Sequence, residues 1–336
     1  MIKDAIAKLA ERIDLSEKEA EEVLFEIMDG AASPVQIAAY LMGLRIKGET
    51  VEEIAGSARA MRARGTRIRV ADPLVMDTCG TGGDRLGTFN ISTTAAFVVA
   101  GSGVTVAKHG NRSVSSRCGS ADVLAALGVK IDLPVDRIGD CVNEVGIGFL
   151  FAPMFHGAMK HCVVPRQELG IRTLLNILGP LSNPAGATMQ VVGVYDHGLT
   201  ELMAKVLMHL GTQHCFSVHG MDGLDEVTLT DRTWVSEGKA GVVSSYFIEP
   251  KNFGLERARL KDLSGGTAHE NAQMTRDVLS GRKGAKRDIV CLNAALALVA
   301  GRRAKTVQDG FELAGRVIES GAAMEKLERL VEFTNK

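Results

Sequence analysis

The sequence predicts an α/β protein, with a small all-helical domain followed by a larger α/β domain that has a central, mostly parallel sheet covered by helices. Residues 1 to about 68 carry only helical periodicity and helix caps. From Leu74 onward, short apolar runs alternate with helical patterns, which is typical of a parallel sheet. Several of these runs are almost continuously apolar, as expected for strands covered on both faces.

Composition limits the functions that the chain can have. The 336 residues include 46% hydrophobic side chains and carry a formal net charge of −1, from 39 basic and 40 acidic residues. This balance argues against a dedicated nucleic-acid binder, because such proteins normally have a basic excess. The charged, amphipathic N-terminus is unlike a signal peptide, and the apolar stretches are too short and interrupted to span a bilayer. The six cysteines show no C-x-x-C spacing, so we expect a soluble, cytoplasmic protein with reduced thiols and neither a membrane nor a nucleic-acid partner.

Two capping boxes mark helix starts in the N-terminal part. Ser16 is followed three residues later by Glu19, and Thr50 is followed by Glu53. In such a box the hydroxyl and the carboxylate each accept a hydrogen bond from a backbone N–H group at the start of the helix. These pairs therefore predict that helices begin directly after Ser16 and Thr50.

A third helix is predicted over residues 34–47. Ser33 supplies a cap, Pro34 suits the first helical position, and Gly48 suits the position just after the last turn. One face of this helix carries an apolar stripe that is suited either to packing within the chain or to a partner helix. The stripe consists of Ile37, Tyr40, Leu41 and Leu44.

The α/β part is predicted from apolar runs that alternate with helical patterns. We expect residues 253–274, which are polar and contain glycine, to form a loop and the start of a helix. Strands are predicted over residues 74–77, 104–108, 189–196, 214–220 and 242–250, and helices over residues 92–101, 120–128, 199–211 and 288–300.

The first candidate site is the loop over residues 77–93, between a predicted strand and a predicted helix. Gly80, Gly82 and Gly83 permit positive φ and close backbone approach. A glycine-rich loop before a helix presents N–H groups to a phosphate, although a plain turn with ordinary capping remains the alternative. The loop matches neither G-x-x-x-x-G-K-[ST] nor G-x-G-x-x-G, which disfavours a nucleoside triphosphatase or a dehydrogenase. Three polar residues at the expected helix start either cap the helix or bind phosphate: Asn90, Ser92 and Thr93.

A second loop of the same kind covers residues 108–120. Lys108 and Arg112 supply positive charge, and two such loops in tandem predict a ligand with more than one phosphate. The alternative is that Ser120 merely caps the next helix and that the cations are solvated. His109 is either a general base or a residue that shapes the loop, and we leave its role open. Further donors in this loop are Asn111, Ser113, Ser115, Ser116 and Ser120.

Adjacent carboxylates follow the predicted strand at residues 214–220. Asp225 and Glu226 suit a hard divalent cation such as Mg²⁺, which takes one or two carboxylates and completes its shell with water and substrate phosphate. An acidic surface turn is the alternative for such a pair. The phosphates predicted for the two loops favour the metal interpretation.

Two arginines lie in the mixed polar and apolar segment over residues 151–186. Arg166 or Arg172 is suited to clamping a carboxylate through two parallel hydrogen bonds. Either could instead pair with Glu168 or another acidic residue, and their spacing does not decide between these roles.

Taken together and in this order, these segments closely resemble the anthranilate phosphoribosyltransferase family of tryptophan biosynthesis. The resemblance covers essentially the whole chain, and its most specific motifs are GTGGD, TFNIST, KHGNRSVSS, GSADVL, ELGIRT, NILGPLSNP and DGLDE. It implies Mg²⁺-dependent transfer of the phosphoribosyl group from 5-phosphoribosyl 1-pyrophosphate to the amine of anthranilate, with release of pyrophosphate. It also implies a homodimer formed through the helical domain, and an active site at the hinge between the domains. The implied domains are residues 1–70, joined by helices from about 166–182, and residues 71–165 with 183–336.

The resemblance also implies a role for individual residues. Lys108 and Arg112 would act by electrostatics and positioning, with no certain acid or base. Anthranilate would contact Gly80, Asn111 and Arg166, with His109, His156 and Arg172 as weaker candidates. Two Mg²⁺ ions would accompany the donor, held by Ser92, Asp225 and Glu226. The phosphoribosyl pyrophosphate site would comprise Gly80, Gly83, Asp84, Thr88, Asn90, Ile91, Ser92, Thr93, Lys108, His109, Gly110, Asn111, Arg112, Ser113, Val114, Ser115, Ser116 and Ser120.

Two other functions are consistent with this architecture. A pyrimidine nucleoside phosphorylase would share the Lys- and Ser-rich phosphate loop, but it would work without Mg²⁺ and lack the NIST and DGLDE motifs in this form. A non-catalytic nucleic-acid-binding relative should have degraded loops and a basic surface, whereas these loops are intact and the charge is balanced. Two departures from the family, HGAM at 156–159 and VVPR at 163–166, lie near the expected anthranilate pocket.

Overall fold

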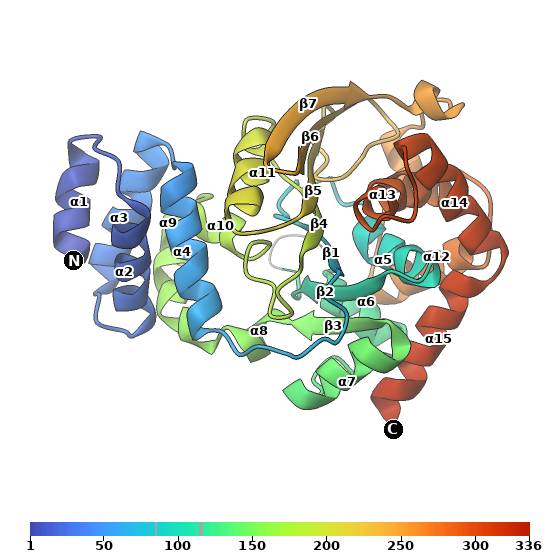
Figure 1. Ribbon diagram of the computed structural model, residues 1–336, viewed down its shortest axis with the longest axis horizontal. Coiled ribbons are helices and arrows are strands. Elements are labelled where there is room, and N and C mark those ends of the chain that lie inside the picture. Colours follow the sequence, from blue (N-terminus) through green and yellow to red (C-terminus); the bar gives the residue numbers. More distant parts are fainter. Residues whose placement is uncertain (85, 114–116) are drawn as a thin grey trace.

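A computed structural model describes residues 1–84, 86–113 and 117–336. Three of the expected phosphate-loop residues, Val114, Ser115 and Ser116, lie outside the described residues. The chain forms a helical lobe and a larger α/β lobe, side by side (Figure 1). The helical lobe contains α1 (Ile2–Ala10), α2 (Glu17–Met28), α3 (Pro34–Lys47) and α4 (Val51–Arg64), and α9 (Val163–Leu169) and α10 (Leu174–Leu178) pack against α3 and α4.

The predicted helix starts are confirmed in the helical lobe. Ser16 and Glu19 form the expected reciprocal capping box at α2, and Thr50 with Glu53 forms the same box at α4. Ser33 caps α3, in which Pro34 is the first residue, and Gly48 follows the last turn with a φ of 90°. These short-range signals are reliable because the cap, the helix start and the helix end are all set within a few residues.

The apolar stripe of α3 packs inside the chain rather than against a partner. Ile37, Tyr40, Leu41 and Leu44 are each at most 1% exposed. They belong to a core cluster that continues from the helical lobe into Leu174–Leu181, α11 and one face of the sheet. Of the two roles left open by the sequence, the structure therefore supports internal packing.

One sheet of seven strands forms the centre of the α/β lobe, in the order β3-β2-β1-β4-β5-β6-β7. The five strands from β3 to β5 are parallel, whereas β6 and β7 form an antiparallel extension. The expectation of a mostly parallel sheet is confirmed. The strands are β1 (Val75–Gly80), β2 (Thr105–Gly110), β3 (Ile147–Phe151), β4 (Met189–Gly193), β5 (His214–Gly220), β6 (Thr233–Lys239) and β7 (Val242–Ile248).

Helices cover both faces of this sheet. On one face, α5 and α13 pack in the largest core cluster; on the other, the cluster shared with the helical lobe covers β4 and β5. The helices of this lobe are α5 (Ile91–Gly101), α6 (Ser120–Ala126), α7 (Val135–Val145), α8 (Ala152–Phe155), α11 (Leu199–His209), α12 (Ala268–Leu279), α13 (Ala285–Ala300), α14 (Val307–Glu319) and α15 (Ala322–Asn335), with short 3₁₀ helices η1 (Gly157–Cys162), η2 (Pro250–Phe253) and η3 (Leu260–Leu263).

The strand order changes direction between β1 and β4. Strands β2 and β3 lie on one side of β1, whereas β4 and β5 continue on the other. In open α/β sheets ligands bind outside the carboxyl ends of the strands at such a switch point. In Figure 1 the arrow of β3 points toward the helical lobe, and so the carboxyl edge of the parallel strands faces the junction of the lobes.

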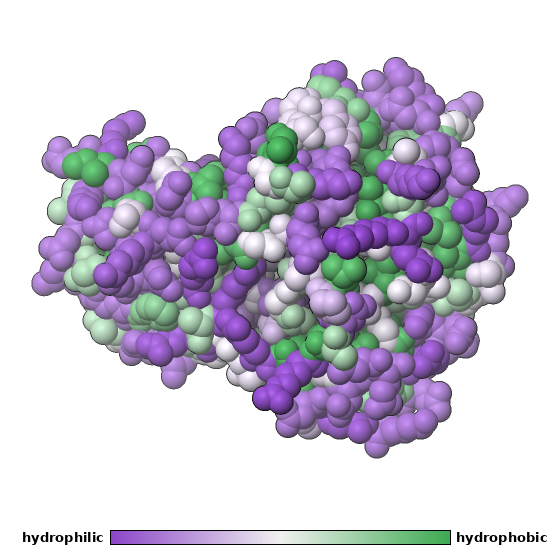
Figure 2. Space-filling model, viewed as in Figure 1, coloured by the Kyte–Doolittle hydropathy of each residue, from purple (hydrophilic) through white to green (hydrophobic). Residues whose placement is uncertain are grey.

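The surface shown in Figure 2 is largely hydrophilic, with apolar residues in small, scattered patches. Its outline is indented where the helical lobe meets the α/β lobe. None of the described helices is both long and apolar enough to cross a membrane.

Candidate active site

The glycine-rich loop after β1 lies at the switch point. Gly82 and Gly83 have φ values of 68° and 82°, which L-residues with side chains rarely adopt. Gly80 is required for a different reason, because a Cβ there would lie 2.6 Å from Asp225 Oδ2. The same carboxylate oxygen accepts a hydrogen bond of 2.8 Å from the Gly82 backbone N–H. The glycines thus allow the loop to wrap around the Asp225 side chain.

The carboxylate pair lies across the ends of β1 and β4. A Cβ at Gly193, the last residue of β4, would lie only 1.6 Å from the Asp225 carbonyl oxygen. Glu226 Oε1 accepts a hydrogen bond of 3.0 Å from the backbone N–H of Ser92 at the start of α5. The structure therefore brings Ser92, Asp225 and Glu226 together. The importance of Gly193 was missed from the sequence, since nothing near it in the chain shows which segment packs on it.

Both carboxyl groups are costly to ionise where they lie. Burial raises the pKa of Asp225, and the neighbouring Asp84 carboxylate raises it further. Burial also raises the pKa of Glu226, with a second contribution from Asp225. Closely placed carboxylates of this kind are stabilised when a cation lies between them.

The donor set fits a magnesium ion that is shared with a substrate. Asp84, Asp225 and Glu226 offer only hard oxygen ligands, which Mg²⁺ prefers. Among the described residues, no three His, Cys, Asp or Glu side chains are arranged to hold a metal ion by themselves. The geometry thus suits an ion that takes the rest of its ligands from water and phosphate.

The start of α5 is held by a polar network rather than by a side-chain cap. Asn90 is the N-cap residue, but its side chain makes no capping hydrogen bond. Its amide donates to the Cys118 carbonyl in the second loop at 3.2 Å and accepts from Asn271 Nδ2 at 2.9 Å. Asn271 on α12 is 1% exposed and also accepts from the Gly266 N–H. The two candidate loops are thereby joined at Asn90.

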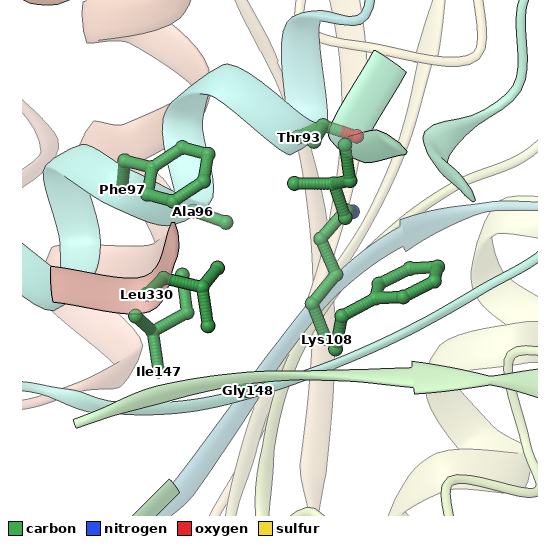
Figure 3. Close-up of a pocket in the computed structure, with 9 residues that line it drawn as sticks. Thr93, Ala96, Phe97, Lys108, Ile147, Gly148 and Leu330 are labelled. Carbon is green, nitrogen blue, oxygen red and sulfur yellow. The ribbon is translucent and has the colours of Figure 1, made fainter. Parts of the chain in front are cut away.

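Lys108 is buried beneath the loops instead of extending into solvent. It is 4% exposed, and its Nζ donates to the Thr78 carbonyl of β1. Burial lowers its pKa, while the charges of Asp77 and Glu226 oppose that shift. Figure 3 shows the side chain running from β2 toward Thr93 along a small cavity lined by Ala96, Phe97, Ile147 and Leu330. Its charge is therefore fixed in position below the start of α5.

The second loop is organised by Asp122. Its carboxylate accepts from the backbone N–H groups of Ser113 and Gly119 and pairs with Arg112 Nη1 at 2.8 Å. Because Asp122 satisfies these groups, it shapes the loop and partly neutralises Arg112. Its position three residues after Gly119 is that of a capping partner, a signal that sequence reasoning missed.

Ser120 does not act only as a helix cap. It is the first residue of α6, after the N-cap Gly119, and its Oγ donates to the Asn111 carbonyl at 3.2 Å. The interpretation in which Ser120 merely caps the helix is therefore not supported. Thr88, another predicted phosphate-site residue, lies farther along the first loop in a bridge with Ser264.

His109 and His156 form a buried pair. Because His109 directly follows Lys108 in β2, its side chain lies on the face of the sheet opposite to that of Lys108. The two histidine rings are 5.2 Å apart, and His109 Nδ1 lies 3.2 Å from the Gly179 carbonyl. Burial lowers the pKa of His156 to about 4, and burial together with His156 lowers the pKa of His109 to about 3. Both rings are therefore neutral at pH 7.

The two arginines expected near a carboxylate have different surroundings. Arg172, between α9 and α10, donates to the Gly83 carbonyl and lies 3.9 Å from the centre of the Tyr195 ring. It therefore braces the first loop from the helical lobe. Arg166 lies on α9 with an exposed side chain, and among the described acidic residues none forms an ion pair with it. Glu168 does not form an ion pair with either arginine.

Comparisons with known proteins give a consistent result. Residues 72–324 match the glycosyl transferase family, a/b domain, and residues 3–65 match the glycosyl transferase family, helical bundle domain. An anthranilate phosphoribosyltransferase of Desulfosudis oleivorans is 55% identical over 335 residues, which is 99% of each chain. The crystal structure of an anthranilate phosphoribosyltransferase from Thermus thermophilus has a TM-score of 0.94 and 44% identity, covering 99% of this chain and 100% of that one. A Saccharomyces cerevisiae enzyme of the same name, in complex with PRPP and Mg, has a TM-score of 0.89 and 28% identity, covering 99% and 98% of the two chains.

Proposed function

The chain belongs to the anthranilate phosphoribosyltransferase family, and we propose that its switch-point site performs the transfer that defines that family. The phosphoribosyl group of 5-phosphoribosyl 1-pyrophosphate moves to the amine of anthranilate, giving N-(5-phosphoribosyl)anthranilate and pyrophosphate for tryptophan biosynthesis. The observation that carries the proposal is the Asp225–Glu226 pair at the carboxyl ends of β1 and β4, enclosed by the first loop.

The donor's phosphates are bound by the two loops. The first loop and the start of α5 lie beside the Asp225–Glu226 pair, and the dipole at the start of that helix favours negative charge. Lys108 and Arg112 add positive charge, and Asn90 keeps the two loops in register. The complete set of predicted phosphoribosyl pyrophosphate residues given above remains our proposal for this site.

Catalysis needs positioning and charge stabilisation more than proton transfer. The bond from the anomeric carbon to the pyrophosphate oxygen breaks as the amine nitrogen bonds to that carbon and loses a proton. The amine of anthranilate is already neutral at pH 7, so no strong base is needed. Among the described residues, His214 pairs with Glu237 and His209 pairs with Glu17. His214 is the first residue of β5 and His209 is the last residue of α11, so neither pair belongs to the two loops. Pre-organised donors at the leaving group therefore supply most of the rate enhancement.

Asp225, Glu226 and Ser92 would hold Mg²⁺ on the donor, with Asp84 beside them. When bound, the ion neutralises charge that develops on the departing pyrophosphate. We propose two ions, because Asp225 and Glu226 offer separate carboxylates on different segments, beside the first loop and beside the start of α5, and each would supply a hard oxygen ligand. Arg166 would bind the carboxylate of anthranilate, with Gly80 and Asn111 completing its site.

The helical lobe supports a homodimer through an unexpected face of α3. Val35 and Ile46 are 79% and 62% exposed and lie three helical turns apart on one face. Ala39 and Met42 fill the intervening positions, so this outer stripe is opposite the buried stripe at Leu41. Val163 and Val164 on neighbouring α9 are also about half exposed, at 48% and 51%. We propose that the outer stripe contacts a second copy, and that the lobes correspond to the domain division given above.

Anthranilate fluorescence tests the proposed transfer directly. Purified protein with anthranilate and Mg²⁺ should cause a loss of fluorescence only after phosphoribosyl pyrophosphate is added. Omitting Mg²⁺ should abolish the loss. No loss with folded protein would reject the transfer, and release of base from thymidine and phosphate without Mg²⁺ would instead identify a nucleoside phosphorylase.

A further inference from the structure

Asn293 is a buried amide in an otherwise apolar stretch of α13. It is 3% exposed, and its neighbours from Ile289 to Leu298 are all buried and apolar. An amide in such surroundings is unfavourable unless its hydrogen-bonding groups find partners. The hydrogen-bond partners of Asn293 therefore indicate its role in the structure.

Both backbone groups of Val227 are bound by this one side chain. The Val227 N–H donates to Asn293 Oδ1, and Asn293 Nδ2 donates to the Val227 carbonyl, each at 2.9 Å. A third hydrogen bond of 2.9 Å, to the Ile289 carbonyl one turn earlier, fixes the amide plane. Val227 is 1% exposed, so water does not replace these partners.

Val227 directly follows the two carboxylates, and a second set of hydrogen bonds closes the turn that contains all three residues. Asp222 accepts from the Leu224 N–H and from the hydroxyl of Thr228, which closes the turn on itself. Asp225 and Glu226 thus lie inside this closed turn, and the Asn293 clamp holds the turn at Val227. Their own hydrogen bonds, from Gly82 and Ser92, go to loops that must also accommodate the donor.

We propose that Asn293 is a positioning residue for the metal site: by clamping Val227 it fixes the Asp225–Glu226 pair at the ends of β1 and β4. It touches neither substrate nor metal and acts only through the Val227 backbone. The inference rests on the proposed role of the two carboxylates as Mg²⁺ ligands. Substitutions of residues that orient metal ligands commonly weaken metal affinity by about 10- to 100-fold.

Equilibrium binding of Mn²⁺ in the presence of inorganic pyrophosphate, followed by electron paramagnetic resonance, tests this without turnover. Asn293→Ala and the near-isosteric Asn293→Leu should raise the Mn²⁺ dissociation constant by about 10-fold. Leu296→Ala is the control, since it removes core packing from the same helix while keeping the Asn293 hydrogen bonds that hold the Val227 backbone. It should leave the dissociation constant within about twofold, although it also destabilises the fold.

The possible outcomes distinguish the positioning role of Asn293 from the metal-binding role of Asp225 and Glu226. Unchanged Mn²⁺ affinity in folded Asn293 variants, or an equal loss in Leu296→Ala, would overturn the positioning role. Unchanged affinity in Asp225→Asn with Glu226→Gln would instead overturn the proposed metal ligands. Steady-state kinetics provide a second test. Asn293→Leu should raise the half-saturating Mg²⁺ concentration, while the KM for anthranilate stays within about twofold of the unsubstituted value.

A measurement on the unsubstituted protein covers the case in which neither Asn293 variant folds. If the clamp favours metal binding, then metal binding must favour the clamp by the same factor. Amide hydrogen exchange at Val227 should therefore slow by about 10-fold when Mg²⁺ and pyrophosphate are added. Exchange at Val227 that is fast, or unaffected by these ligands, would contradict the inference.

Discussion

At the residue scale, the site depends on side chains that are defined by contacts across long stretches of the chain. The glycines of the first loop and the Asp225–Glu226 pair could be predicted from the sequence, because their types and local spacing suit phosphate and metal. Gly193 and Asn271 could not, because each matters through a segment distant in the chain. Candidate phosphate and metal groups can therefore be recognised from local motifs, whereas the residues that hold those motifs in place become visible only in the fold.

Arg166 should discriminate between the two substrates. Replacing it with alanine would remove the proposed charge-assisted hydrogen bond to the anthranilate carboxylate, and such a bond contributes about 1.5–3 kcal/mol. Arg166→Ala should therefore raise the KM for anthranilate by at least about 10-fold and leave that for phosphoribosyl pyrophosphate nearly unchanged. Initial-rate kinetics with each substrate varied would measure this, with Arg329→Ala on α15 as a remote control. Equal effects on both KM values would refute a role at the carboxylate.

The buried histidine pair should make stability sensitive to acid. In the unfolded chain His156 binds a proton near pH 6.5, whereas burial lowers its folded pKa to about 4. A lowered folded pKa gives stability that is present above pH 6.5 and is lost as the pH falls toward 4. His156 alone should therefore cost about 2 kcal/mol between pH 7 and pH 5.

His156→Phe keeps an aromatic ring but removes this titration. Its free energy of unfolding, measured in urea at both pH values, should fall less between pH 7 and pH 5 than that of the unsubstituted protein. His109 lies against the same ring and remains titratable, so some loss should persist. Equal losses in the two proteins would show that His156 is not held neutral.

At the scale of elements, the capped helices α2, α3 and α4 and the apolar strands were predicted well, whereas strands β3 and β6 and helices α7, α14 and α15 were missed. β5 matches its predicted range, and α3 begins and ends where its cap and its glycine indicate. β3 was missed because its five residues follow α7 directly and its apolar run continues into α8, so no period distinguishes strand from helix. β6 was missed because its polar residues face neighbours in the antiparallel hairpin with β7 and leave no apolar run.

The contact between α2 and α4 provides a test at this scale. A Cβ at Gly56 would lie 2.0 Å from the Glu17 carbonyl oxygen, so Gly56→Ala must push the helices apart. We expect a loss of about 2 kcal/mol in the free energy of unfolding. Gly315→Ala is the control, because it adds the same methyl group to the interior of α14, where the nearest atom is the end of the Arg287 side chain at 3.4 Å. It should stabilise by up to about 1 kcal/mol, and similar effects of the two substitutions would contradict the close packing.

At the scale of the whole molecule, the candidate site lies where the two lobes meet. Arg172 connects the helical lobe to Gly83 through a hydrogen bond to its carbonyl. A second connection joins His209 Nε2 of α11 to Glu17 Oε2 of α2, at a distance of 2.7 Å. The two-lobe arrangement and the mostly parallel sheet were predictable from the change of periodicity near Leu74. The face of α3 that packs inside was not, because its two apolar stripes lie on opposite sides and periodicity cannot say which one is buried.

The oligomeric state tests the outer stripe of α3. Ile46→Asp places a charge on a 62% exposed apolar position and should convert a dimer to monomers. Val242→Asp makes the same kind of change at a 67% exposed position on β7 of the other lobe and should leave the mass unchanged. Sedimentation velocity would distinguish them. A dimer that tolerates Ile46→Asp, or a native monomer, would exclude this face as the interface.

The central claim is that Asp225 and Glu226 hold Mg²⁺ on the donor's pyrophosphate at the switch point. The most direct test is the initial rate of anthranilate consumption over a range of Mg²⁺ concentrations, for the unsubstituted protein and for Asp225→Asn with Glu226→Gln. The paired substitution keeps both shapes and removes both charges, so we expect a much lower maximal rate and a half-saturating Mg²⁺ concentration raised by at least about 10-fold. A folded double variant with an unchanged Mg²⁺ profile would contradict the account.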